Sequence, residues 1–348
     1  MYYPPHDFTT AHLVAGCGGG RYTPAAMTRE IDCIVCGSCV VDMLVRPVPL
    51  DRAIGGGRLV HVQPIEVTTG GIVSNSGIAM AKLGMKVAAF SYVGRDEWAP
   101  IIRRKYESEG LDASHLLTHP TGATSTTAVL IDPSGERTFA HCVGAPREMN
   151  GRTFLDNLDL FRRSRMALIG YYSLMPNLEG DLPRVLEALR SVGCKTALDA
   201  AGDGGSMQPL DRLLPHLDVY VPSHNEAEHQ TQENDPRKII ETYRRCGAPG
   251  VLGVKLGSKG ALLSDRAGSF IEISAVKPPG DVVDTTGAGD SFYAGLLTGI
   301  LRGMDLGEAG RLAAATGACC VTGLGATAGL RGYNETARLA GLVEMSSV

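Results

Sequence analysis

The chain has 348 residues, of which 44% are hydrophobic and 20% charged, and its formal net charge is −4. This length and composition are typical of a soluble globular protein with one large domain and an appendage. Without a run of Lys or Arg the sequence gives no support to nucleic-acid binding, and no stretch approaches the roughly 18 apolar residues of a membrane span.

In chain order, residues 1–30 are rich in Gly, Pro and Thr, lack periodicity and are expected to form an extension. From Ile31 onward, strand and helix patterns alternate, which predicts a mostly parallel sheet covered by helices on both faces. Strands are expected at residues 31–41, 86–93, 165–169, 195–198, 218–221, 251–256 and 261–264. Helices are expected at residues 74–83, 97–109, 179–191, 287–302, 306–321 and 335–343, with another after the N-cap residue Ser223.

Two segments interrupt this alternation. Residues 43–69 contain a strand-like run at 59–67, and residues 124–142 contain two β runs around the turn sequence at 132–135. They predict a small antiparallel sheet that projects from the core, or alternatively two unrelated surface hairpins. Because a small exposed sheet has an open edge and a face that needs cover, we expect a homodimer contact through it. The core would then comprise residues 31–42, 70–123 and 143–348.

Nine cysteines occur, and the spacing of Cys33, Cys36 and Cys39 invites a metal interpretation. These three fall on an expected strand, where a spacing of three residues sends consecutive members to opposite faces. We therefore expect buried thiols and no zinc site. Free thiols fit a reducing, cytoplasmic location.

The most informative stretch is residues 284–290, Asp-Thr-Thr-Gly-Ala-Gly-Asp, which leads into an apolar helical run. Gly287, Ala288 and Gly289 leave backbone N–H groups accessible at a helix N-terminus, where the helix dipole also favours a polyphosphate. A carboxylate beside a phosphate site costs electrostatic energy unless it takes part in the chemistry. Asp290 is therefore expected to accept a proton from an attacking hydroxyl. The alternative is an ordinary glycine-rich loop.

This stretch resembles the C-terminal signature of the ribokinase-like (PfkB) carbohydrate kinases. The N-terminal signature of that family is matched by Gly70-Gly71, followed by Asn75 and a short helix of small residues. The resemblance extends over about residues 31–345. It implies a ribokinase-like α/β fold, a three-layer sandwich, in which residues 43–69 and 124–142 form a β lid over the sugar.

The resemblance also implies a sugar site. Asp42 lies at the carboxyl end of the opening strand, where open α/β sheets usually bind ligands, and its carboxylate can accept hydrogen bonds from two hydroxyls. Gly70 and Gly71 let the backbone approach a ligand, and Asn75 can both donate and accept. In the family the matching residues hold the sugar, whereas a lone Asp after a strand is usually a turn former.

On the nucleotide side, the turn at residues 255–260 resembles a loop that packs against ribose or phosphate. The resemblance implies that ATP is bound by Lys255, Gly257, Ser258, Gly260 and Asn225 together with Gly287, Ala288 and Gly289. The same turn is equally a β-turn between two strands. Asn225 and Glu228 resemble the family's Asn-x-x-Glu motif, which helps hold Mg²⁺ largely through water. The alternative for this pair is a capping Asn and a solvated Glu.

A monovalent-cation site is a further implication. In many relatives the acid that opens the C-terminal signature, together with carbonyls of a later loop, binds K⁺. The matching positions are Asp284, Thr286, Cys320, Gly323, Gly325 and Gly329. Relatives often carry a hydroxyl residue where this chain has Gly329, so K⁺ dependence is left open.

Together these features imply ATP-dependent phosphorylation of a hydroxyl on a small sugar, with Asp290 as general base and Mg²⁺ between the phosphates. Relatives that act on ribose or on phosphorylated sugars often carry Lys just after the glycine pair, where this chain has Ile72. An unphosphorylated ketohexose or a related sugar is therefore the first expectation. The alternatives are a nucleoside kinase of the same fold and a catalytically idle regulator that binds sugar or nucleotide. No Gly-x-x-x-x-Gly-Lys-Ser/Thr loop occurs, which argues against a P-loop kinase.

Overall fold

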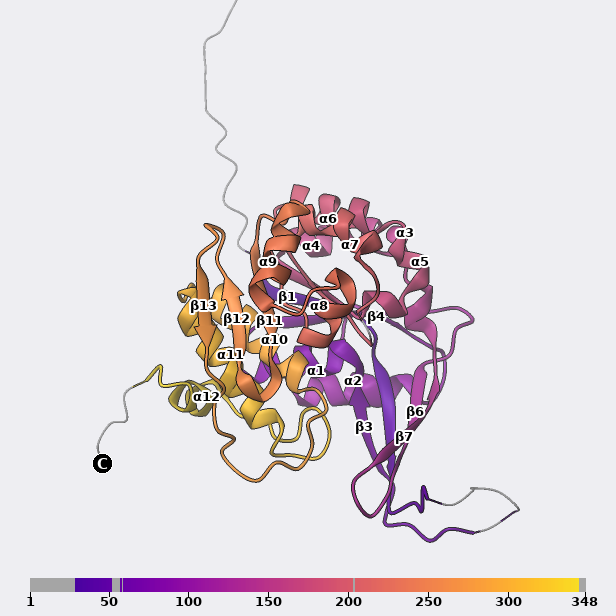
Figure 1. The fold of residues 1–348 in the computed structure, drawn as a ribbon. Helices are drawn as coiled ribbons and strands as arrows, with labels where there is room; N and C mark the ends of the chain where they lie inside the picture. Colours follow the sequence, from indigo (N-terminus) through magenta and orange to yellow (C-terminus); the bar gives the residue numbers. More distant parts are fainter. Residues whose placement is uncertain (1–28, 52–56, 58, 203, 344–348) are drawn as a thin grey trace, which may run out of the picture.

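A computed structural model describes residues 29–343 except 52–56, 58 and 203. Its main feature is a nine-stranded sheet, sheet A, with the strand order β13-β12-β11-β10-β9-β8-β1-β4-β5. The edge strands β13, β12 and β11 can be followed in Figure 1. Neighbouring strands pair parallel except along β11-β12-β13, where the pairing is antiparallel, so the prediction of a mostly parallel sheet is confirmed. The strands are β1 (Ile31–Gly37), β4 (Val87–Val93), β5 (Leu116–Thr118), β8 (Ser164–Gly170), β9 (Lys195–Asp199), β10 (Val219–Tyr220), β11 (Val251–Lys255), β12 (Ala261–Ser264) and β13 (Phe270–Ile273).

Helices cover both faces of sheet A, as a parallel sheet requires. One face packs against α1 (Gly71–Lys82), α2 (Ala99–Ser108), α10 (Ala288–Leu301) and α11 (Leu306–Cys320), and α12 (Tyr333–Leu339) packs on α11. The other face packs against α3 (Gly151–Leu155), α4 (Leu158–Arg162), α5 (Pro176–Glu179), α6 (Leu182–Ser191), α7 (Met207–Leu213), α8 (His224–Thr231) and α9 (Pro236–Arg245). The described residues also contain four short 3-10 helices: η1 (Ala145–Glu148), η2 (Tyr172–Leu174), η3 (Leu214–His216) and η4 (Gly257–Lys259).

The three clustered cysteines illustrate the two cores. Cys33 and Cys39 are buried on the face of sheet A that packs against α1, α2, α10 and α11. Cys36 is buried on the opposite face. All three are free thiols and are fully buried, which confirms the prediction of buried thiols. Among the described residues, no helix has the length and apolarity needed to cross a membrane.

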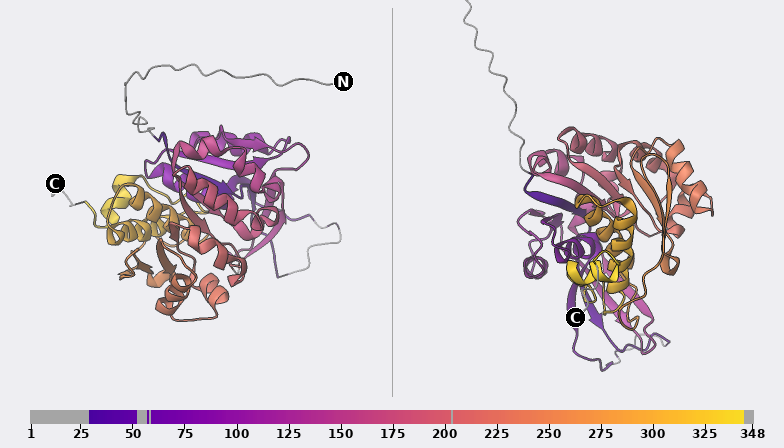
Figure 2. Two further views of the ribbon diagram at one scale, coloured as in Figure 1. Left: turned by 90° about the horizontal axis from the view of Figure 1, so that it is seen from above. Right: turned by 90° about the vertical axis from the view of Figure 1, so that its left-hand side faces the viewer.

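A smaller four-stranded sheet, sheet B, projects from the core (Figure 1; Figure 2, right). Its strand order is β3-β2-β6-β7. β2 pairs antiparallel with β3 but parallel with β6, so the prediction of an antiparallel sheet was wrong for this central pair. Parallel neighbours need a long crossover, and the chain supplies it by passing through sheet A between β2 and β6. The strands are β2 (Val40–Val45), β3 (Glu66–Gly70), β6 (Ser125–Ile131) and β7 (Arg137–Cys142).

Three predicted boundaries were wrong for identifiable reasons. The single strand expected at 31–41 is divided between the two sheets, because Gly37 has φ 132° and turns the chain out of sheet A. The run at 59–67 gives only β3, since Pro64 lacks the N–H that a ladder needs. The helix expected at 179–191 begins at Leu182, with Pro183 in its first turn, after the separate helix α5.

Candidate active site

A cavity of about 320 Å³ lies between sheet B and the core. Its walls bring together four of the five residues that the sequence predicted to bind the substrate, which are Asp42, Gly70, Gly71 and Asn75, and the fifth, Asp290, is bonded to Asn75 behind the wall. The same cavity reaches Asp284, Thr286 and Gly325 of the predicted cation set. Residues that lie far apart in the chain therefore meet where sheet B covers the carboxyl ends of the core strands.

Asp42 forms the sheet B side of this cavity. It lies on β2 between Thr68 of β3 and Thr127 of β6, and Thr127 Oγ1 lies 3.0 Å from His141 Nδ1. Burial raises the pKa of the Asp42 carboxyl, while the hydrogen bond with Thr127 opposes this shift. A Cβ on Gly70 would lie 2.2 Å from Asp42 Oδ2, so only glycine leaves this carboxylate in place.

Asp290 is buried, with 7% of its surface exposed, in the first turn of α10. Its Oδ2 accepts two hydrogen bonds of 2.7 Å, from Asn75 Nδ2 and from the Tyr171 hydroxyl, and both donors line the cavity. Oδ1 accepts no hydrogen bond from any described residue. Burial raises the pKa of Asp290, and the two hydrogen bonds and Lys255 oppose the shift. The carboxylate is thus held rigidly by one oxygen, and the other is available.

The loop before α10 has the geometry that the sequence predicted. Gly287 is the N-cap residue with φ 76°, and a Cβ there would lie 2.4 Å from Ala326 Cβ, so both conformation and space require glycine. The Ala288 N–H donates to the Thr285 carbonyl at 3.2 Å. The N–H groups of Gly287 and Gly289 donate to no described group, which leaves them available to an anion at the positive end of the helix dipole.

Lys255 lies beside this loop at the end of β11. Its Nζ is 3.5 Å from the position of a Cβ built on Gly289 and 3.6 Å from Asp199 Oδ1. Burial alone would lower the pKa of Lys255, but Asp199, Glu226 and Asp290 together raise it, so the ammonium stays charged. Burial also raises the pKa of Asp199 to about 7, against the effect of Lys255. A cation is therefore held next to the loop at Gly287–Gly289, which we call the anion loop.

None of the predicted nucleotide and Mg²⁺ residues lines the cavity itself. Gly257 and Ser258 are exposed in the turn η4, and Gly260 is the buried residue that ends it. Asn225 and Glu228 lie on the first turns of α8, which Ser223 caps as predicted. Between them Glu226 is buried, and its negative charge raises the pKa of Asp199, Lys255 and Asp290. The N-terminus of α8 is thus directed toward the charged end of the site.

The predicted K⁺ residues do come together, but an arginine joins them. Asp284 Oδ1 accepts the Thr286 N–H, Oδ2 accepts the Gly325 N–H at 2.7 Å, and the Arg137 guanidinium forms an ion pair with Oδ1 at 2.8 Å. Arg137 also donates to the Thr286 hydroxyl. Cys320 Sγ contacts the Thr286 carbonyl, and Gly323 N–H contacts the Cys320 carbonyl. A Cβ on Gly329 would lie 2.6 Å from the Cys320 carbonyl oxygen.

Sequence reasoning missed three residues of this site, namely Tyr171, Asp199 and Arg137. Asp199 ends β9 and Tyr171 directly follows β8, so both stand at carboxyl ends of parallel strands. That signal identified Asp42 and could have identified them too. Tyr171 also has a left-handed backbone, with φ 58°, which is uncommon outside glycine. Arg137 carries no such signal, because only the path of β7 brings it to Asp284.

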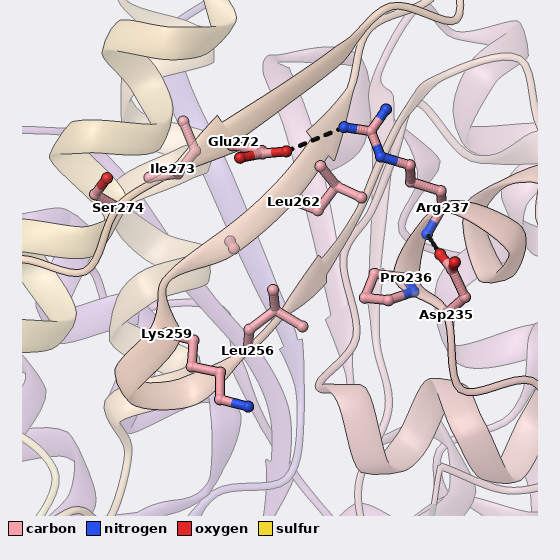
Figure 3. A pocket seen from close by; sticks show the side chains of 10 residues that line it. Asp235, Pro236, Arg237, Leu256, Lys259, Leu262, Glu272, Ile273 and Ser274 are labelled. Carbon is pink, nitrogen blue, oxygen red and sulfur yellow. Dashed lines mark hydrogen bonds and ion pairs between the residues drawn. The ribbon is translucent and has the colours of Figure 1, made fainter.

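A second hollow, of about 440 Å³, lies beside the turn η4 (Figure 3). Two of its charged side chains pair with each other, Arg237 with Glu272 at 3.0 Å, and Asp235 accepts the Arg237 backbone N–H at 2.8 Å. None of the residues predicted for sugar, phosphate or cation lines it.

Comparison with known proteins places this site in context. Residues 31–331 match the family described as pfkB family carbohydrate kinase. An uncharacterized sugar kinase of Archaeoglobus fulgidus is 29% identical over 73% of this chain and 98% of its own length. The ribokinase of Haemophilus influenzae is 27% identical over 80% of this chain and 90% of its own.

The fold is shared with solved structures. The structure of Arabidopsis thaliana ribokinase complexed with ribose and ATP superposes with a TM-score of 0.78, covers 89% of this chain and 98% of that one, and is 22% identical. This likeness confirms the ribokinase-like α/β fold that the sequence predicted.

Proposed function

The chain belongs to the pfkB family of carbohydrate kinases, and we propose that it transfers a phosphoryl group from ATP to a hydroxyl of a sugar or sugar unit held against Asp42 and Asn75. One observation carries this proposal. Asp290 follows the anion loop directly and is bonded to Asn75 and Tyr171, which line the acceptor cavity. A base, an anion site and a polyol site thus meet at one carboxylate.

In the proposed mechanism Asp290 accepts the proton of the attacking hydroxyl at Oδ1, since Oδ2 is engaged by two donors. Burial raises the pKa of Asp290, which makes it a better proton acceptor than an ordinary carboxylate, while the hydrogen bonds from Asn75 and Tyr171 oppose this rise. The sugar hydroxyls are oriented by the Asp42 carboxylate and by the backbone at Gly70 and Gly71.

The free N–H groups of Gly287 and Gly289 and the Lys255 ammonium stabilise the charge on the transferred phosphoryl group. Because the transition state of phosphoryl transfer is thought to be loose, most of the rate comes from positioning and electrostatics. The short distance from Lys255 Nζ to the Gly289 position supports this role.

Asn225 and Glu228 fit Mg²⁺, because an amide and a carboxylate on neighbouring helical turns suit a hydrated ion. When bound, Mg²⁺ would neutralise charge on the donor phosphates. The Asp284 carboxylate would first have to release Arg137 before it could coordinate K⁺, so we route no step through this ion, and K⁺ binding stays a prediction.

Sheet B is proposed to act as the lid. The ion pair between Arg137 of β7 and Asp284 of the core links it to the loop that precedes the anion site. Closure would exclude water, which competes with the sugar for the phosphoryl group. The homodimer through this sheet stays a prediction, which light scattering can check.

The test is the substitution Asp290→Asn, with ADP release measured against a panel of sugars. We expect kcat to fall about 10²–10⁴-fold while ATP still binds, the range for a positioned general base. Asp305→Asn is the matched control, because Asn caps a helix as well as Asp does and Asp305 caps α11 outside the site. Equal turnover in Asp290→Asn would remove Asp290 from the mechanism. A wild-type protein that binds sugar without releasing ADP would be the idle regulator.

A further inference from the structure

The register of sheet B sorts the cavity wall into rows. In one of these rows, Thr68, Asp42, Thr127 and His141 lie side by side on four strands, and all four are polar. Two residues farther along the strands, about 7 Å away, the next row that faces the cavity is apolar. Its members that line the cavity are Leu44, Val129 and Phe139, while Glu66 at the β3 end of the row pairs with Arg46 and does not line it.

Core residues face this apolar row across the cavity. Leu324 packs against Leu44, Val129 and Ile131, and Leu174 lines the same space. Phe139 is 58% exposed and Leu174 is 49% exposed, although both line a cavity. Exposed large apolar side chains that gather in one cavity indicate a surface that a ligand covers.

We propose that the acceptor is a nucleoside, whose sugar binds the polar row and whose planar base lies between the apolar row and Leu174. This inference rests on the proposed phosphotransferase function and specifies its substrate class. A free hexose or pentose carries hydroxyls around its ring and fills only the polar row. It would leave Phe139 and Leu174 exposed to water, whereas a base joined to the sugar reaches them.

The arrangement suits a heterocycle better than an aliphatic group. Phe139 offers a ring face for stacking. An aromatic side chain can stack on any nucleobase, because every base has a π-face. His141 and Arg137 lie two residues to either side of Phe139 on β7 and line the same cavity, so the ring is flanked by polar side chains.

The experiment measures ADP release by the full-length protein with free ribose, fructose, adenosine and inosine, in wild type and in Phe139→Ala. We expect kcat/KM for a purine nucleoside to exceed that for either free sugar. Phe139→Ala should lower kcat/KM for the nucleoside about 5- to 150-fold, the loss expected when one stacking ring is removed, and should change free-sugar turnover little. Thr138→Ala is the control, because Thr138 lies on the same strand but points to the opposite face.

The outcomes separate the two proposals. Turnover of free sugars without turnover of nucleosides would overturn the nucleoside assignment and leave the kinase function intact. An equal loss in Phe139→Ala for sugars and nucleosides would also overturn it, since Phe139 would then not contact a base. If neither the free sugars nor the nucleosides caused ADP release, the proposed function itself would be overturned. Calorimetric binding of adenosine to Asp290→Asn, weakened by Phe139→Ala, supports the assignment independently of turnover.

Discussion

Removing the Tyr171 hydroxyl should move the acid limb of the pH profile upward. Tyr171 donates one of the two hydrogen bonds that stabilise the ionised Asp290 carboxylate. A hydrogen bond to a charged group contributes about 1.5–3 kcal/mol, and each pKa unit corresponds to about 1.36 kcal/mol. Tyr171→Phe should therefore raise the pKa of Asp290 by about 1–2 units above its already raised value.

The sign follows from the role of Asp290 as a base. Because the base must be ionised, kcat/KM falls as the pH drops through its pKa, and a higher pKa moves this fall to higher pH. The assay is kcat/KM for the acceptor measured from about pH 5 to 9 by ADP release at saturating ATP. The limb in Tyr171→Phe should lie about 1–2 units above that of wild type.

The neighbouring tyrosine provides the matched control. The Tyr172 hydroxyl donates to the Gly204 carbonyl at 3.2 Å and not to Asp290, so Tyr172→Phe should leave the acid limb in place. An unchanged limb in Tyr171→Phe would refute the reasoning, because either Asp290 would not be the titrating base or its charge would not depend on this bond. A limb that moved downward would contradict the sign of the argument.

Three further predictions concern the acceptor, the donor and the lid. Asp42→Ala should raise KM for the acceptor far more than KM for ATP, because each lost charged hydrogen bond should weaken acceptor binding by about 1.5–3 kcal/mol. Equal effects on both constants would place Asp42 outside the acceptor site. Lys255→Met should lower kcat about 10²–10³-fold, as loss of one transition-state donor does. This substitution also leaves the buried Asp199 without its partner, so the double variant with Asp199→Asn is the control. Recovery of kcat in the double variant would show that the ammonium is not needed. Arg137→Met should abolish acceptor-dependent protection of sheet B in hydrogen exchange, whereas protection equal to wild type would mean that the ion pair with Asp284 does not hold the lid.

The sequence by itself determined the parts of this protein that depend on neighbours in the chain. Gly287, Ala288, Gly289 and Asp290 are consecutive, so the properties of a helix N-terminus follow from local conformation alone. The alternation of strands and helices likewise determined a mostly parallel sheet, because such strands must be joined by crossovers. The faces of Cys33 and Cys36 followed from the two-residue period of a strand.

Tertiary structure decided what depends on segments far apart. Tyr171 and Asn75 reach the same oxygen of Asp290 only because β8, α1 and α10 converge. The pairing of β2 with β6 was likewise not readable from either strand, since alternation gives the face of a side chain but not its neighbour across the ladder. That register places Val129 between Leu44 and Phe139, and thereby creates an apolar wall from residues that carry no signal one by one.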